Sequence, residues 1–79
     1  MTEDDRAPFA FDEFLYLQVA DRIAARIRAG EFSRTGKLPG RPEMCRRYGV
    51  GAGVMEHAWR ELKQRGLIVT VPGHGTFTA

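Results

Sequence analysis

The sequence predicts a small, mainly α-helical domain of three helices that ends in a β-hairpin. Three segments, at about 13–29, 41–48 and 52–65, repeat apolar residues every three or four positions, which is the period of a helix with one buried face. A glycine follows each segment, as is typical of a helix end. The remainder, from residue 67, is instead rich in β-branched residues around a Pro-Gly-His-Gly turn, which favours a hairpin.

The first helix is expected from about Glu13 to Ala29, with Asp12 as its N-cap and Gly30 after its end. Its apolar stripe comprises Leu15, Val19, Ala20, Ile23, Ala24 and Ile27. Residues 1–11 precede it and are expected to form an acidic, flexible arm, because they show no sustained period. Residues 12–79 are therefore expected to form the single folded domain.

The second helix is expected from Arg41 to Tyr48, after a polar connector in which Leu38-Pro39 forms a very short strand. Pro42 falls in its first turn, where a missing N–H has no helical partner. Gly49 permits a positive φ and so a steep crossing to the next helix. Met44, Cys45 and Tyr48 share its inner face, and core packing is the favoured interpretation of all three.

The third helix is expected from Ala52 to Arg65, with an inward stripe of Met55, Ala58, Trp59 and Leu62. For Trp59, core packing is the favoured interpretation, and an exposed anchor for a protein partner is the alternative. Strands at 67–71 and 76–78 then flank a turn at 72–75. Two helices joined by a tight turn and followed by a hairpin predict a winged helix-turn-helix, with the helix-turn-helix at about 41–60 and the wing at about 67–78.

Several spaced blocks of the sequence resemble the GntR family of bacterial transcriptional regulators. They are LYLQVADRIAARIRAGEF, LPGRPEMCRRYGV, AWRELKQRGLI and GHGTF, and they agree in order and separation across residues 14–79. The resemblance implies a winged helix-turn-helix that binds palindromic operator DNA, usually as a homodimer. The family's C-terminal ligand-sensing domain has no counterpart in these 79 residues.

The sequence departs from the family pattern at the residues that would read DNA. The capping Ser is replaced by Gly40 and a DNA-contacting Arg by Pro42, although Arg41 stands one position earlier. At the start of the third helix, the base-reading Arg is replaced by Ala52 and a phosphate-facing Arg by Glu56. Ala52 cannot form the bidentate pair with guanine, which is worth about 1–3 kcal/mol of discrimination. The sequence thus predicts recognition by backbone, wing and arginines.

The candidate DNA-binding residues lie on the second helix, the start and outer face of the third helix, and the wing tip. They are Arg41, Arg46, Arg47, Gly51, Ala52, Gly53, Val54, Glu56, His57, Arg60, Gly73, His74, Gly75 and Thr76. Glycines at the start of the third helix allow a phosphate to approach closely, and Val54 suits a thymine methyl group. Arg46 and Arg47 are interpreted either as phosphate clamps or as a solvated helix face.

Charge is distributed unevenly along the chain. Residues 1–13 carry five carboxylates against one arginine, a net charge of −4, whereas residues 14–79 carry eleven Lys and Arg against five Asp and Glu, a net charge of +6. A small basic domain is electrostatically suited to a polyanion such as double-stranded DNA. The leading hypothesis is therefore a DNA-binding transcriptional regulator, and the alternative is a protein-interaction adaptor that has lost direct base readout.

An enzyme is the least favoured class. The only serine, Ser33, lies in the connector, and the only cysteine, Cys45, has no histidine near it in its helix. One cysteine and two separated histidines do not form a metal site, so neither a metal nor a cofactor is expected. A single cysteine excludes an internal disulfide and fits the cytoplasm.

The sequence contains no run of 18 apolar residues, so no membrane span is predicted.

Overall fold

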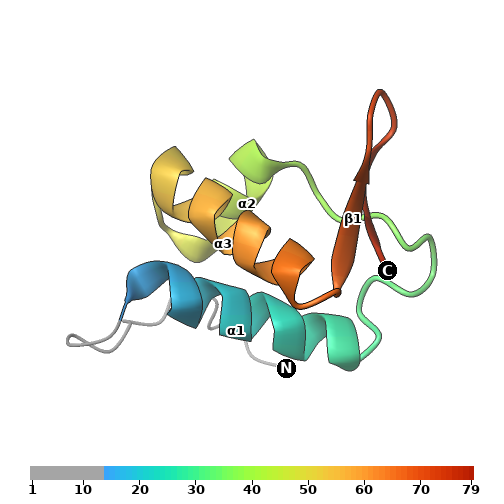
Figure 1. Ribbon diagram of the computed structural model, residues 1–79, viewed down its shortest axis with the longest axis horizontal. Helices are drawn as coiled ribbons and strands as arrows, with labels where there is room; N and C mark the ends of the chain where they lie inside the picture. Colours follow the sequence, from blue (N-terminus) through green and yellow to red (C-terminus); the bar gives the residue numbers. More distant parts are fainter. Residues whose placement is uncertain (1–13) are drawn as a thin grey trace.

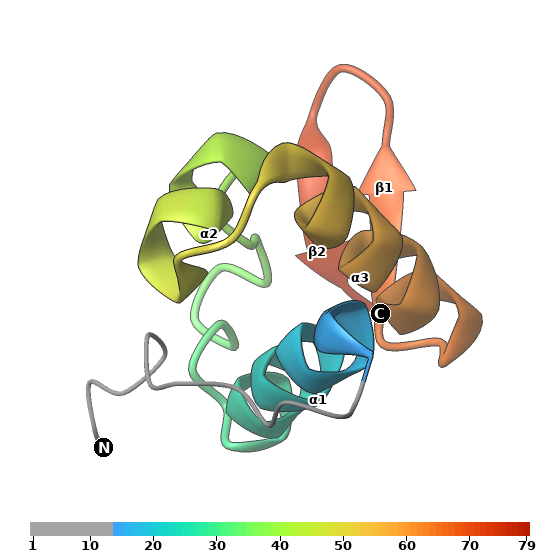
Figure 2. The same cartoon turned by 90° about the vertical axis from the view of Figure 1, so that its left-hand side faces the viewer.

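The computed structural model describes residues 14–79, which form three helices and a two-stranded antiparallel sheet (Figure 1). The elements are α1 (Leu15–Arg28), α2 (Arg41–Tyr48), α3 (Ala52–Gln64), β1 (Ile68–Val71) and β2 (Gly75–Thr78). α1 lies on one side of α3, and the tip of the hairpin points away from α1 (Figures 1 and 2). The predicted fold class is confirmed. The expected arm at 1–11 lies outside the described residues.

α1 begins later than the sequence suggested. Its first residue is Leu15 and Phe14 is its N-cap, in extended backbone with no side-chain cap, while the expected cap Asp12 lies outside the described residues. The buried part of its stripe is confined to the middle turns: Val19, Ala20, Ile23 and Ala24. At the ends of the stripe, Ile27 is half-buried and packs against the core, whereas Leu15 is 38% exposed.

The connector after α1 reaches the sheet but adds little to it. A single bridge pairs Lys37 with Phe77, and the Leu38 N–H donates to the Thr76 carbonyl at 2.9 Å. The short strand expected at Leu38-Pro39 is therefore reduced to one bridge at the preceding residue. Pro39 has no N–H to donate, so the ladder cannot continue through it. Leu38 itself is buried in the core.

The second helix and its turn follow the prediction closely. α2 spans Arg41–Tyr48, its N-cap Gly40 provides no side-chain cap, and Gly49 ends it in the left-handed conformation at φ 70°, ψ 36°. Met44 and Tyr48 are buried, and Cys45 is half-buried and packs against the core, so the expected core packing of all three residues is confirmed, with Cys45 less buried than the other two. Cys45 lies at the edge of the α2–α3 contact, where it lines a surface groove.

α3 supplies much of the core. Its whole expected stripe is buried: Met55, Ala58, Trp59 and Leu62. The helix ends at Gln64, one residue earlier than expected, and Arg65 becomes its C-cap. β1 pairs with β2 from Ile68 opposite Thr78 to Val71 opposite Gly75, so Gly75 belongs to the strand and not to the turn.

Arg65 links the end of α3 to α1. Its guanidinium pairs with the Asp21 carboxylate at 2.8 Å and donates from Nε to the Glu61 carboxylate at 2.9 Å. The hydrogen bond to Glu61 and, after it, the contact with Asp21 raise the pKa of Arg65 above its ordinary value, although desolvation acts in the opposite direction. This guanidinium therefore helps to set the angle between two helices.

Candidate nucleic-acid interface

The helix-turn-helix and the hairpin tip lie on the same side of the domain. In both views α1 runs along the opposite side, while α2, the start of α3 and the tip of the hairpin face away from it (Figures 1 and 2). We call β1, β2 and their connecting turn the wing. The turn at 49–51 joins α2 directly to α3. The elements that carry the three predicted groups of site residues therefore lie on one side, although His57 and Arg60 line a cleft against Tyr16 of α1.

The first turn of α3 presents almost no side chain to solvent. Gly51 is its N-cap and Ala52 and Gly53 follow, and all three are exposed. A Cβ added at Gly51 or Gly53 would meet nothing within 4 Å, so packing within the domain does not require either glycine. The backbone at this point is open to close approach by another molecule's surface.

Two residues at and just after the end of this turn differ in accessibility. Val54 is half-buried and packs against the hydrophobic core, whereas Glu56 is exposed. Much of the Val54 side chain is therefore committed to packing within the domain. The exposed carboxylate of Glu56 adds negative charge to the outer face of α3.

His57 faces the start of α1. Its ring stacks on Tyr16, with ring centroids 3.7 Å apart and planes 5° from parallel, and Arg60 shares the same small cleft of about 340 Å³. The contact joins the outer edge of α3 to α1. Tyr16 was absent from the predicted site, because the two rings are brought together only by the packing of α1 on α3.

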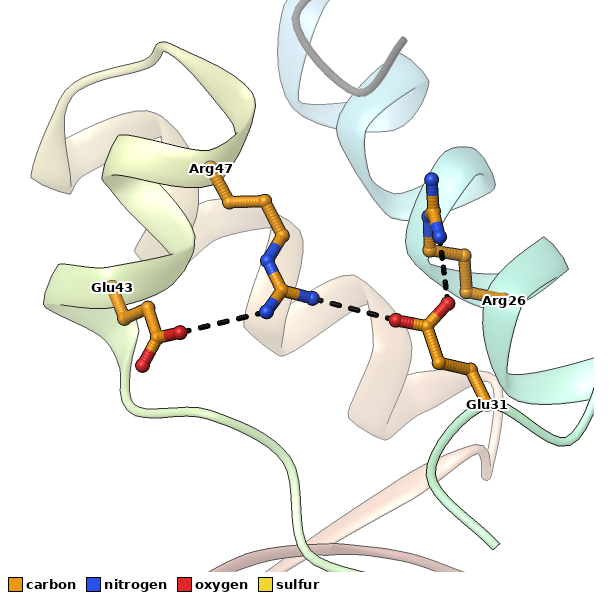
Figure 3. Close-up of polar contacts among 4 residues, drawn as sticks. All are labelled: Arg26, Glu31, Glu43 and Arg47. Atoms are coloured by element: carbon orange, nitrogen blue, oxygen red, sulfur yellow. Dashed lines mark hydrogen bonds and ion pairs between the residues drawn. The ribbon is translucent and has the colours of Figure 1, made fainter. Parts of the chain in front are cut away.

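The three arginines of α2 have different surroundings. Arg47 lies between two carboxylates: its guanidinium pairs with Glu31 at 3.4 Å and with Glu43 at 3.5 Å (Figure 3). The second oxygen of Glu31 accepts from Arg26 of α1 at 2.7 Å. Figure 3 therefore shows a chain of four charged side chains that connects α1, through the connector, to α2.

Arg41 and Arg46 are exposed, and no ion pair holds either of them within residues 14–79. Arg41 is the first residue of α2 and lines the grooves on both sides of it, toward the wing and toward the start of α3. Of the two adjacent arginines that the sequence treats alike, Arg46 is free and Arg47 is held by carboxylates.

The wing tip is a glycine-flanked turn. Gly73 has φ 80° and Gly75 has φ 119°, and His74 between them is exposed. Thr76 instead faces inward: its hydroxyl accepts from the Trp59 indole at 3.3 Å and lies 3.1 Å from the Thr70 hydroxyl. Thr76 thereby fixes the wing to α3, whereas His74 stays accessible.

Trp59 is a core residue. Only 3% of it is exposed, so the alternative interpretation of an exposed anchor for a protein partner is wrong. Its indole N–H reaches Thr76 of the wing, which explains why an aromatic residue with a polar atom fits this position. Trp59 therefore sets the position of the wing relative to α3.

A groove of about 570 Å³ separates the wing from the start of α2. Arg41 and His74 line it, as predicted site residues, and so does Lys37 from the connector. Lys37 was not among the predicted site residues, because a lysine in a polar connector is ordinary. The one feature of the sequence that could have indicated its role is its position directly before Leu38, which is buried.

Within the described part of the chain, no cluster of residues suits a metal ion.

Together, the helix-turn-helix and the wing define a winged helix-turn-helix domain, the class of fold that places one helix in a DNA groove. Residues 15–78 match the sequence pattern described as "Bacterial regulatory proteins, gntR family". The match covers most of the chain, and the protein therefore belongs to the GntR family of bacterial regulatory proteins.

Individual relatives agree with this assignment. The chain is 35% identical over 63 residues to the uncharacterized HTH-type transcriptional regulator YurK of Bacillus subtilis, which covers 80% of this chain and 26% of YurK. It is 32% identical over 63 residues to the mannosyl-D-glycerate transport/metabolism system repressor MngR of Escherichia coli, covering 80% of this chain and 27% of MngR. The chain thus spans about a quarter of the length of these two relatives.

A solved structure extends the likeness to three dimensions. AraR(DBD) in complex with operator ORE1 superposes with a TM-score of 0.76 at 30% sequence identity, covering 91% of this chain and 90% of that one. In the described part of the protein, no helix is both long and apolar enough to cross a membrane.

Proposed function

We propose that this chain binds double-stranded operator DNA as the DNA-binding domain of a transcriptional regulator. In this arrangement the first turn of α3 enters the major groove, and the wing tip contacts the adjacent backbone or minor groove. The observation that carries the proposal is the placement of the open first turn of α3, the free Arg41 and the exposed His74 on one side of the domain. The similarity to AraR(DBD), whose structure is a complex with operator ORE1, supports operator DNA as the partner.

Base readout in this complex rests on few side chains. Ala52 presents a methyl group where a long donor would reach guanine, and the carboxylate of Glu56 can only accept, for example from a cytosine amino group. The backbone N–H groups at the start of α3 suit a phosphate, since neither Gly51 nor Gly53 carries an obstructing side chain. We therefore infer that phosphate contacts and DNA shape contribute most of the affinity.

We further infer that the protein binds a palindromic operator as a homodimer. We also infer that it acts in the cytoplasm, as a regulator and not as an enzyme. One domain of this size contacts few base pairs, and a second copy doubles that number. MngR, named as a repressor, supports a role in transcriptional control. A measured stoichiometry of two protein chains per operator duplex supports the dimer, whereas one chain per duplex argues against it.

The test is a titration of random-sequence duplex DNA, followed by fluorescence anisotropy at several salt concentrations. Each phosphate contact contributes about 0.9 to the log–log slope of affinity against salt, so we expect a slope of several. Selection of a preferred duplex from the random pool would then identify the operator. Absence of binding at low salt, or a slope near zero, would refute the proposal.

A protein-interaction adaptor is the second candidate. A groove of about 630 Å³ between α2 and the start of α3 favours it, because Pro42, Cys45, Val50 and Ala52 give this groove an apolar lining. Glu56 at its edge disfavours a phosphate. Selection of a palindromic duplex by the wild-type chain would exclude this candidate as the main function.

A further inference from the structure

The groove between the wing and the start of α2 contains a lysine that is held in place by the sheet. Lys37 forms the bridge to Phe77, and the neighbouring Leu38 N–H donates to the Thr76 carbonyl at 2.9 Å. The backbone of Lys37 is therefore attached to β2. Lys37 is nevertheless exposed, so its side chain is free to reach a partner.

The side chain of Lys37 runs along β2 toward the wing tip. It begins opposite Phe77 and ends beside Gly75, two residues nearer the tip. A Cβ added at Gly75 would lie 2.8 Å from Cε of Lys37 and 3.5 Å from Nζ. Contacts below about 3 Å do not occur for real Cβ atoms, so a side chain at position 75 would displace the lysine. Gly75 thus leaves room for the ammonium group at the base of the wing tip.

The surroundings of this ammonium suit an anion. No carboxylate pairs with Lys37 within residues 14–79, in contrast to Arg26, Arg47 and Arg65. The same groove is lined by Arg41, which also lacks a carboxylate partner. Two free cations from different elements therefore face one groove of about 570 Å³ beside the exposed wing tip.

We propose that Lys37 binds a backbone phosphate of DNA in this groove and that Gly75 is the residue that positions it. The proposal rests on the proposed DNA-binding function and extends it to a residue outside the helix-turn-helix and the hairpin. A lysine acts on a phosphate as a point charge, so its contribution is independent of base sequence and depends on salt.

The test compares Lys37→Ala with Lys63→Ala in the random-duplex titration. Lys63 is an exposed lysine in the last turn of α3, outside the groove, and its replacement removes the same charge. For Lys37→Ala we expect a slope smaller by about 0.9 and an affinity about five- to tenfold lower at ~0.1 M salt, for every duplex alike. Lys63→Ala should keep the wild-type slope, and Lys37→Arg should restore most of the affinity. Thermal unfolding of each variant shows that it is folded.

A double-mutant cycle tests the role of Gly75. Gly75→Ala alone should lower the slope by less than Lys37→Ala does, because its methyl group displaces the flexible end of the lysine without removing the charge. Gly75 has φ 119°, so the thermal unfolding of this variant is measured alongside. In the Lys37→Ala background, Gly75→Ala should cause no further loss of slope. A full further loss would show that Gly75 acts independently of the lysine and would refute the positioning role.

Three outcomes separate the possible failures. If the wild type binds DNA with a slope of several and Lys37→Ala matches Lys63→Ala, the inference about Lys37 is wrong while the proposed function stands. If the wild type does not bind DNA, the proposed function itself fails. If inorganic phosphate at constant ionic strength raises the melting temperature of the wild type but not of Lys37→Ala, and Lys37→Ala keeps the wild-type DNA slope, the groove is a site for a free anion and not for DNA.

Discussion

Replacement of Glu31 by glutamine tests whether the four-residue charge chain holds α2 against α1. Glu31 uses both of its oxygens, one toward Arg26 at 2.7 Å and one toward Arg47 at 3.4 Å. The amide of Glu31→Gln has the same shape but only one acceptor oxygen, so it cannot serve both guanidinium groups. The change therefore breaks the link between the two helices without altering the packing.

The expected loss follows from the two distances and exposures. Exposed ion pairs contribute about 0.2–1 kcal/mol each. The Arg26 side chain is only 14% exposed and its contact is short, so this pair belongs near the upper end of that range. The longer pair to Arg47 belongs near the lower end. We expect Glu31→Gln to lower the free energy of unfolding by about 1 kcal/mol, which corresponds to a fall in Tm of about 4–8 °C for a domain of this size.

Thermal unfolding followed by circular dichroism measures this loss, and Glu43→Gln is the matched control. Glu43 is 54% exposed and makes one contact of 3.5 Å to the same Arg47, so its replacement should cost less than half as much. At ~1 M salt, where the Debye length is about 3 Å, the difference between the two variants should shrink. Equal stability of Glu31→Gln and wild type at low salt would show that these contacts do not hold the helices together.

Three further predictions concern the recognition side. Arg46→Ala should reduce the salt slope of DNA binding by about 1, whereas Arg47→Ala should mainly lower Tm. The reason is that, among the described residues, carboxylates pair with Arg47 and none pairs with Arg46. Equal slopes in titrations of both variants would contradict this division. Gly49→Ala should lower the free energy of unfolding by about 1 kcal/mol, as measured by chemical denaturation. Gly49 has φ 70°, and a residue with a Cβ atom is disfavoured in this left-handed region. An unchanged free energy of unfolding would show that this turn tolerates a side chain. Ala52→Arg adds a hydrogen-bond donor at an exposed position of α3. It should increase discrimination between duplexes by about 1–3 kcal/mol where a guanine lies in reach. A repeated selection from random duplexes would detect this gain as a sharper consensus sequence.

The sequence predicted the helices well because their signals are local. Apolar periodicity and a glycine after each helix depend only on neighbouring residues, and α2 was placed without error from Arg41 to Tyr48. The starts and ends of α1 and α3 were less accurate, because the packed neighbours decide where a stripe stops being buried. Leu15 shows this clearly: it fits the period of α1 and yet is 38% exposed.

The surroundings of the site residues could not be predicted, because they depend on contacts between distant segments. Glu31 reaches Arg47 across sixteen residues, and Tyr16 stacks on His57 of another helix. Neither contact leaves a periodic signal in the sequence. The adjacent Arg46 and Arg47 are equivalent by composition, and only the course of the connector makes one of them a partner of carboxylates.

The basic residues of the domain thus divide by the carboxylates around them. Arg26, Arg47 and Arg65 are paired at positions that join α1 to the other helices, so their charge is largely compensated within the domain. Within residues 14–79, no carboxylate pairs with Lys37 or Arg41, and both line one groove beside the wing. Net charge alone does not reveal this division. The three paired arginines and their four carboxylates sum to −1, so the other residues of 14–79 carry a net charge of +7. Part of this uncompensated positive charge lies beside the wing, where it is available to a polyanion.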